Sequence, residues 1–307
     1  MTITFNCPKC GFICAFKDAH AGRRARCLKC DQVFIIPAGD NQKAEKVKPP
    51  KENYDPLPGF YEAVFKRTLS AIFNKQGMAT LFFVLLVTTL KFFIEHMSYV
   101  MRIPCQSGGT LDIYMPFGRA IAVLIWGGLF WVYAEIIYAT AFDVEFLPEI
   151  IFEGGAGYFA KVFSSIYSFF IIIFVVLLPA IIFRNIFLFA GITSRWAVLP
   201  FVALGMFLFP MAVLIVSIGR DLTMLFRPDY FFAPVKKAFK HYLFVAAIFI
   251  IVCQLQYMSK NYGDIASKSV FMVLQNLAFV LLVQILIIFA MRTAGLFYRH
   301  FACYFKW

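Results

Sequence analysis

Charged residues are scarce in this chain of 307 residues: they make up 15% of it, against about a quarter of a soluble globular domain. Histidine occurs only 4 times, and the HExxH pair of a zinc hydrolase is missing. The Walker phosphate loop, the GxSxG nucleophile elbow and the dinucleotide-binding fingerprint are missing as well. The scarcity of charge excludes an ordinary soluble domain, and the missing motifs argue against enzymes of these classes. We therefore expect a protein that is not an enzyme.

Apolar residues make up 61% of the sequence, and the mean hydropathy is +0.76. They gather in runs, and about 20 apolar residues suffice to cross the hydrocarbon core of a bilayer. The sequence predicts an all-α polytopic membrane bundle of about six transmembrane helices, over residues 78–98, 119–142, 161–183, 196–218, 241–258 and 269–291. Lys91 interrupts the first run and is expected to extend outward. The apolar segment 185–195 is too short to cross again, so we predict a tight turn at the outer interface.

Lysine and arginine are distributed unevenly between the predicted loops. With the N-terminus inside, 22 of the 29 Lys and Arg residues fall in the inner segments. Cytoplasmic loops of membrane proteins carry this excess. No apolar run of a signal peptide follows the start of the sequence, which reads MTITFNCPKC. We therefore expect both termini in the cytoplasm, and we attribute the net charge of +12 to membrane insertion rather than to nucleic-acid binding.

Four cysteines form two CxxC pairs near the N-terminus, Cys7 with Cys10 and Cys27 with Cys30. Sixteen residues separate the pairs, a spacing typical of structural zinc sites. A two-residue spacer brings both sulfurs of a pair to one ion, and two pairs complete a tetrahedron of thiolates. We predict one structural Zn²⁺ with these four cysteines as its ligands. A redox dithiol and an iron–sulfur cluster are the alternatives.

Composition divides the chain into four regions. Residues 1–38 are a small β-type zinc ribbon, in which short β-prone segments flank the cysteine pairs. Residues 39–56 are rich in Lys, Glu, Asn and Pro, which is typical of a flexible linker. Residues 57–76 repeat apolar residues at helical spacing beside basic ones, which predicts an amphipathic lead-in helix. That helix lies either in the membrane interface or as a cytoplasmic extension of the next span. Residues 77–307 are the multi-pass transmembrane domain.

The predicted ribbon has strands over 3–5, 12–16 and 32–36. Cys14 could displace a zinc ligand, but its spacing from Cys10 does not form a CxxC pair, so an apolar strand residue is the favoured interpretation. Three arginines, Arg23, Arg24 and Arg26, lie between the cysteine pairs. They belong to a solvated loop, contact anionic lipid, or bind nucleic acid with the help of aromatic stacking. The aromatic residues nearby are equally expected in the core of the ribbon, so the sequence does not favour nucleic acid as a partner.

Two ionisable residues are predicted within or at the edge of the spans. Glu135 lies roughly 10 Å below the inner end of the second span, and Lys161 begins the third. Ionisable residues in membrane helices are functional candidates by default. We predict that the two side chains form a pair. The pair either fixes the packing of the two helices or forms a proton or cation site.

The first 38 residues resemble a bacterial zinc-ribbon module, with the pattern Phe-x-Cys-Pro-x-Cys-Gly, then Ala-Gly-Arg before Cys-x-x-Cys, then a strand ending in Ile-Pro. The matching residues are Phe5 to Gly11, Ala21 to Cys30 and Ile36-Pro37. The resemblance implies zinc binding by the four cysteines, ahead of a membrane or signalling domain. The remainder is similar to an uncharacterised family of bacterial polytopic membrane proteins, on residues that include Tyr133–Ile137, Phe209–Met211 and Pro228–Pro234. A more distant similarity to Yip1-type proteins implies a trafficking or envelope role.

These inferences predict a protein of the bacterial inner membrane whose helical bundle anchors a cytoplasmic zinc ribbon. The ribbon would contact a protein or the membrane surface. The alternative is a transporter or channel that uses the bundle interior around Glu135. The expected partners are the lipid bilayer and a cytoplasmic protein bound through the ribbon.

Overall fold

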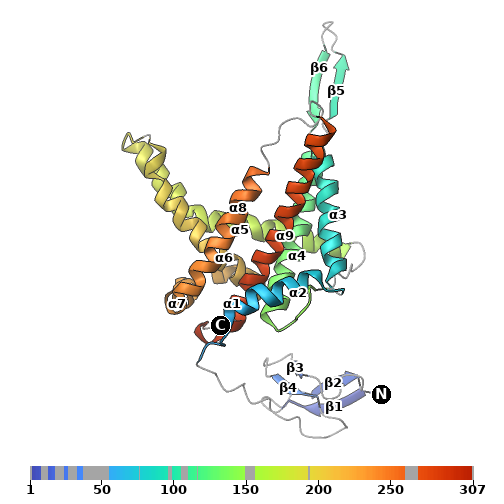
Figure 1. Ribbon diagram of the computed structural model, residues 1–307, viewed down its shortest axis with the longest axis vertical. Coiled ribbons are helices and arrows are strands. Elements are labelled where there is room, and N and C mark those ends of the chain that lie inside the picture. Colours follow the sequence, from blue (N-terminus) through green and yellow to red (C-terminus); the bar gives the residue numbers. More distant parts are fainter. Residues whose placement is uncertain are drawn as a thin grey trace. The chain divides into compact units, whose positions relative to one another are not determined.

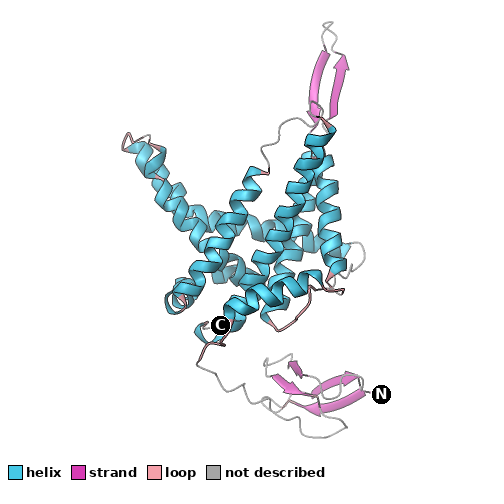
Figure 2. Ribbon diagram, in the orientation of Figure 1, coloured by secondary structure: helices cyan, strands magenta, loops and turns pink. Residues whose placement is uncertain are grey.

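The computed structural model describes most of the chain, and the described part divides into two compact units, Met1–Asp55 and Pro56–Trp307. The described residues are 2–7, 13–17, 24–26, 33–36, 55–75, 77–95, 99–104, 110–115, 117–148, 156–192, 194–259 and 269–305. The regular elements described in the first unit are strands, and helices dominate the second (Figures 1 and 2).

Two antiparallel hairpins form the described part of the first unit. They pair β1 (Thr2–Asn6) with β2 (Ile13–Lys17) and β3 (Arg24–Arg26) with β4 (Val33–Ile35). Ile3 and Phe5 are two positions apart in β1, so they share one face. They are buried there with Cys7, Cys14 and Ile36. Cys14 is therefore a buried residue of β2, at a position where the sequence predicts a strand.

Among its described residues, the second unit has five helices long and apolar enough to cross a membrane. These are α4 (Phe117–Ala141), α5 (Ala156–Phe189), α6 (Leu199–Gly219), α8 (Phe239–Met258) and α9 (Val270–Phe301). Each covers one predicted span, so the prediction of a helical membrane bundle is confirmed for these five. The remaining span corresponds to α3 (Met78–Ile94), whose 17 residues reach the required length only with the helical segment before it.

The lead-in segment lies across the end of α3. It consists of α1 (Phe60–Glu62), a π-helical turn (Ala63–Arg67) and α2 (Thr68–Phe73). The segment meets α3 at 78°, which excludes a straight extension of that span (Figure 1). Phe65, Leu69 and Phe73 are exposed on it beside Lys66 and Arg67. Exposed apolar residues next to basic ones are the pattern of a helix in the membrane interface.

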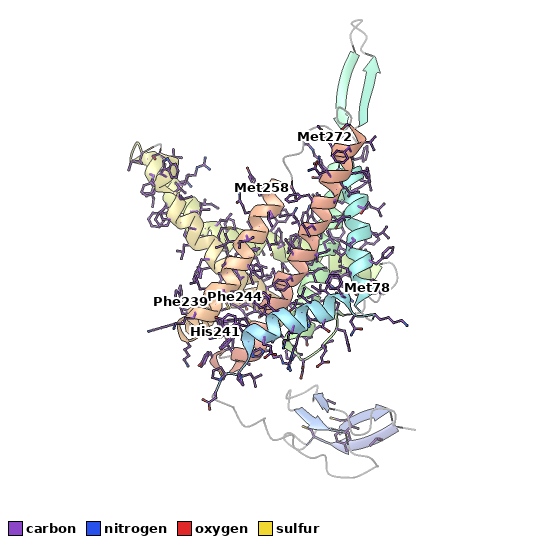
Figure 3. The ribbon with its side chains drawn as sticks, in the orientation of Figure 1. Met78, Phe239, His241, Phe244, Met258 and Met272 are labelled. Atoms are coloured by element: carbon purple, nitrogen blue, oxygen red, sulfur yellow. The ribbon has the colours of Figure 1, made fainter. Side chains whose placement is uncertain are left out.

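Phe60 attaches the lead-in segment to the bundle. Its side chain is 3% exposed. The ring centroid lies 5.7 Å from those of His241 and Phe301, and 6.4 Å from that of Phe244. His241 and Phe244 come from the first turns of α8 (Figure 3), and Phe301 ends α9. One aromatic side chain thus joins the segment to two spans, in edge-to-face contacts that aromatic rings favour.

α5 continues into the segment 185–195, where the sequence predicts a tight turn, so that prediction places the turn too early. The helix closes where Ile192 N–H donates to the Phe187 carbonyl at 2.8 Å and Gly191 N–H donates to that of Leu188 at 3.1 Å. This is a Schellman arrangement, in which glycine takes a left-handed conformation. Gly191 has φ +76° and supplies it. The glycine, not the end of the apolar run, sets the end of the helix.

α4 and α9 are the central helices of the bundle. α4 contacts α3, α5, α6 and α9, and α9 also contacts α3 and α8 (Figure 1). The two approach closely at Gly295 of α9, where an added Cβ would lie 2.7 Å from the Ile137 carbonyl oxygen of α4. Small residues permit this approach between membrane helices. Ile136, Ile215 and Ile288 are fully buried in the hydrophobic core of the bundle.

β5 (Tyr99–Pro104) and β6 (Thr110–Met115) form an antiparallel hairpin between α3 and α4. The sequence predicts only an outer loop here. Figure 1 shows the hairpin at the end of the bundle opposite α1 and α2.

Candidate functional site

A cavity of about 630 Å³ lies between α4, α5 and α6, and a 3-10 helix, η4 (Leu222–Phe226), and α9 complete its wall. Apolar rings form part of the lining. The polar and charged lining residues are Tyr133, Glu135, Lys161, Ser164, Ser165, Ser168, Ser217 and Arg220. Ionisable side chains facing the interior of a membrane bundle mark ligand and ion sites, so this cavity is the candidate site.

One face of α5 supplies much of the polar lining. Lys161 is followed by serines three, four and seven residues later, Ser164, Ser165 and Ser168. These intervals fall on one side of an α-helix. A different face carries Ile166, which packs so closely on Gly127 of α4 that a Cβ there would collide with it. α5 is therefore held against α4 by one face and presents its serines to the cavity with another.

Arg220 reaches the cavity from the C-terminal end of α6. Its backbone has φ +51°, a left-handed conformation that costs a non-glycine residue roughly 1–2 kcal/mol. The guanidinium Nη2 lies 3.4 Å from Glu135 Oε2, and Cζ lies 4.6 Å from the centroid of the Tyr138 ring. Backbone strain of this kind concentrates at functional sites. The strained turn is therefore what brings the guanidinium to α4.

A side-chain cap fixes the chain after Arg220. Asp221 is the N-cap of η4 and accepts hydrogen bonds from the Thr223 backbone N–H and hydroxyl, both at 2.8 Å. These bonds hold the pKa of the Asp221 carboxyl below its ordinary value. The ionised cap thus defines the direction in which the chain leaves Arg220.

Glu135 pairs with Arg220 rather than with Lys161, so the predicted Glu135–Lys161 pair is wrong. Both carboxylate oxygens of Glu135 lie 3.4–3.5 Å from Arg220 Nη2. Lys161 lines the same cavity, with Nζ 5.4 Å from the centroid of the Trp131 ring. The partner of Glu135 depends on the left-handed turn at the end of α6, which hydropathy does not reveal. The described lining of the cavity thus includes the cationic side chains of Arg220 and Lys161 and the carboxylate of Glu135.

A second cavity of about 390 Å³ adjoins the first and is almost wholly apolar. The residues that line both are Phe130, Tyr133, Phe169, Phe209 and Met291, so these side chains form a shared wall. The rings of Phe130 and Phe169 stack in that wall with centroids 3.5 Å apart. The second cavity extends from the wall between α4, α5, α8 and α9. The interior of the bundle thus passes from a charged space to an apolar one.

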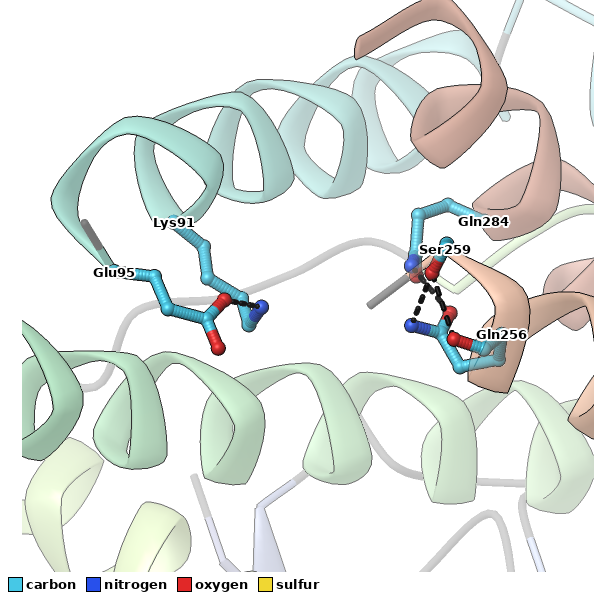
Figure 4. A network of polar contacts seen from close by, with 5 residues as sticks. All are labelled: Lys91, Glu95, Gln256, Ser259 and Gln284. Carbon is cyan, nitrogen blue, oxygen red and sulfur yellow. Dashed lines mark hydrogen bonds and ion pairs between the residues drawn. The ribbon is translucent and has the colours of Figure 1, made fainter. Parts of the chain in front are cut away.

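A chain of hydrogen bonds links α4, α9 and α8 beside the second cavity. The Tyr133 hydroxyl donates to Gln284 Oε1, and Gln284 Nε2 donates to Gln256 Oε1 at 3.1 Å. Gln256 Nε2 donates to Ser259 Oγ at 3.1 Å (Figure 4). Polar groups in the hydrocarbon region need such partners. Because Tyr133 belongs to the shared wall, this chain holds the wall in place.

Lys91 is part of the packing of α3. Its Nζ lies 2.5 Å from Glu95 Oε2 (Figure 4) and 5.2 Å from the centroid of the Trp126 ring. The Lys91 side chain is only 12% exposed. Lys91 therefore forms an ion pair with Glu95 near the end of α3, whereas the sequence predicts only that its side chain extends outward.

The predicted zinc site lies mostly outside the described residues. Of its ligands, Cys7 is described and is buried directly after β1, whereas Cys10, Cys27 and Cys30 are not described. In the part of the chain that the structure describes, no group of three or more His, Cys, Asp or Glu side chains could hold a metal ion. The zinc site stays a prediction from the cysteine spacing.

Arg220 and the serines of α5 are the site residues that the sequence interpretation missed. A signal for the serines is present, because their spacing from Lys161 puts them on its helical face. Arg220 has no comparable local signal, and the sequence assigns it to the basic residues of an inner loop. Glu135 and Lys161 were found because charge is rare in apolar runs.

Five apolar helices that can cross a membrane, with a charged cavity among them, define this chain as a multi-pass helical membrane protein. No family model, curated protein or solved structure matches it. Its function therefore rests on the chemistry of the cavity.

Proposed function

We propose that this protein binds an anionic ligand inside its helix bundle, as a transporter or a membrane-embedded receptor does. The supporting observation is the cavity of about 630 Å³, whose described lining includes the cationic side chains of Arg220 and Lys161 beside the carboxylate of Glu135. Ligand sites typically occupy about 300–1,000 Å³. A bundle that serves only as an anchor needs no such site, because ionisable groups inside a membrane are costly. A function of the bundle interior around Glu135 is therefore favoured over a role as an anchor alone.

Arg220 is the residue from which we expect the main ligand contact. Its planar guanidinium matches carboxylate and phosphate groups in a bidentate way. The side chains of Arg220 and Glu135 are 62% and 39% exposed, and an ion pair of this kind contributes about 0–1 kcal/mol. A hydrogen bond to a charged group contributes about 1.5–3 kcal/mol. Glu135 contacts only Nη2, at 3.4–3.5 Å, so the remaining donors of the guanidinium can make such bonds to a ligand anion.

Replacing Arg220 by glutamine is expected to weaken ligand binding about 10- to 150-fold, through the loss of one hydrogen bond to a charged group. Binding is measured as the ligand-induced rise in unfolding temperature of the purified protein in detergent, against a panel of phosphates, sulfates and carboxylates. The matched control is Arg227→Gln. Arg227 Nη1 donates to the Tyr230 hydroxyl at 3.0 Å, and Arg227 does not line the cavity. Identical responses of the two variants, or a wild-type protein that responds to no anion, would contradict the proposal.

A second candidate function is the anchoring of a zinc ribbon at the cytoplasmic face of the bacterial inner membrane. The division of the chain at Asp55 favours it, because both CxxC pairs fall within the first unit. The Leu57 N–H donates to the His300 carbonyl at 2.9 Å, so the bundle starts and ends on one side. This agrees with two cytoplasmic termini, as does the excess of Lys and Arg in the predicted inner segments. The ribbon would then be available to a cytoplasmic protein.

Inside-out membrane vesicles that contain the full chain are expected to lose one zinc ion per chain to a membrane-impermeant chelator. Right-side-out vesicles should keep it. The double variant Cys10→Ser, Cys27→Ser is the control and should carry no zinc, because two of four thiolates are removed. Absence of zinc from the wild-type chain would refute the zinc prediction. Release only from right-side-out vesicles would refute the orientation.

A further inference from the structure

We infer that the ligand of the cavity is a phosphate-bearing amphiphile, with its phosphate at Arg220 and its apolar chain in the second cavity. The inference rests on the proposed function and adds the class of ligand. It starts from the change in polarity along the two cavities: the first is charged, and the second is almost wholly apolar. A molecule with one charged end and one apolar end is complementary to both.

The charged cavity suits a phosphodiester. Arg220 offers a fork of donors, Lys161 a compact charge, and the serines of α5 offer hydroxyl donors, all of which phosphate oxygens accept. The carboxylate of Glu135 lines the same cavity and repels negative charge, which favours a singly charged phosphodiester over a dianion. The lining therefore selects a monoanionic phosphate.

The shared wall is the point where the apolar chain passes from one cavity to the other. The stacked rings of Phe130 and Phe169 lie in it. Phe169 belongs to α5, whose apolar window is only 17% buried, against 44% for α4. Much of α5 therefore faces the outside of the bundle, while the hydrogen bond from Tyr133 to Gln284 fixes the other side of the wall. Because the two cavities share this wall, an apolar chain that passes it enters the second cavity.

The second cavity opens to the lipid-facing surface of the bundle. Two of its lining residues, Val123 and Phe170, are 46% and 61% exposed. Both lie on spans that are apolar enough to face the bilayer. A ligand that dissolves in lipid thus has a direct route inward, whereas a small anion would leave this cavity empty. The opening favours an amphiphile over a water-soluble phosphate ester.

A lysophospholipid with a diazirine at the end of its chain tests the inference on the full protein in detergent micelles. After photolysis we expect cross-links on the second cavity, at residues such as Phe249, Val252 and Ile287. Arg220→Gln should weaken probe binding about 10- to 150-fold, and Arg227→Gln should leave it unchanged. Glu135→Gln should strengthen binding, because it removes a charge that repels the phosphate. Weaker binding by the Arg220 variant together with stronger binding by the Glu135 variant would indicate contact with the ligand, because loss of folding would weaken binding in both.

Two comparison compounds separate the possible failures. A monoacylglycerol with the same diazirine chain lacks the phosphate, and equal cross-linking by both probes would show lipid contact alone and overturn the inference. Glycerol phosphate lacks the chain. If it binds in an Arg220-dependent way while the lysophospholipid does not reach the second cavity, the inference fails and the proposed function stands. If no anion binds in an Arg220-dependent way, both fail.

Discussion

Valine in place of Gly295 is expected to lower the unfolding temperature of the protein by about 6–12 °C. An added Cβ at this position would lie 2.7 Å from the Ile137 carbonyl oxygen and 2.7 Å from Thr140 Cβ. The central helices α4 and α9 must then move apart, and overpacking of this severity costs about 3 kcal/mol. For a chain of this size, each kcal/mol corresponds to about 2–4 °C. Scanning fluorimetry in detergent measures the shift.

Alanine substitutions at Gly295 and Gly128 provide the matched comparison. At Gly128 an added Cβ meets the Tyr158 hydroxyl at 3.1 Å, which is the far end of a side chain that can move. Alanine is favoured over glycine in a helix by about 1 kcal/mol at either position. Gly128→Ala should therefore be neutral or stabilising, whereas Gly295→Ala should still destabilise. Equal effects would show that α4 and α9 are not in close contact at Gly295.

The five membrane-crossing helices can be predicted from hydropathy, because a segment that crosses the lipid must be a long apolar run. Hydropathy does not predict where these helices end. α9 is predicted to stop at residue 291, but it continues to Phe301 through Arg292, which is only 2% exposed. The Arg292 Nη2 donates to the Glu145 carbonyl at 3.1 Å. A charge therefore marks the end of an apolar run and not the end of a helix, since a carbonyl from a distant loop can accept a hydrogen bond from it.

The bend before α3 illustrates a different limit. An amphipathic helix has the same apolar spacing whether it lies in the interface or continues a span, so periodicity cannot decide between them. The structure decides at Asn74, which ends α2 with ψ 147° and thereby leaves the helical conformation. The sequence contains polar residues at this point, but they are compatible with either arrangement.

Pairings across the bundle are the part of the site that no local pattern contains. Tyr133 and Gln284 are 151 positions apart, and Glu135 and Arg220 are 85 positions apart. Each residue alone is recognisable as a polar group near lipid, and such a group needs a partner. Which partner it finds depends on the order of helices in space and, for Arg220, on a backbone conformation that few residues adopt. Sequence could therefore locate Glu135 but not its ion pair.

Replacing Phe60 by alanine is expected to cost about 3–5 kcal/mol, the usual range for a buried phenylalanine. The ring is 3% exposed and contacts His241 and Phe301 at centroid distances of 5.7 Å. Its loss leaves a gap between the lead-in segment, α8 and α9. We expect the unfolding temperature in detergent to fall and trypsin to cleave faster at Lys66, because the segment detaches from the bundle.

Phe73→Ala is the control, because Phe73 lies on the same helical segment with 63% of its side chain exposed and should change stability by less than about 0.5 kcal/mol. A Phe60 variant that cleaves faster but keeps its unfolding temperature would show that the segment detaches without opening the bundle. Equal cleavage and stability in the two variants would refute the docking role of Phe60. The Leu57–His300 hydrogen bond at 2.9 Å adjoins the same aromatic cluster. Detachment of the segment is therefore expected to break the Leu57–His300 hydrogen bond as well.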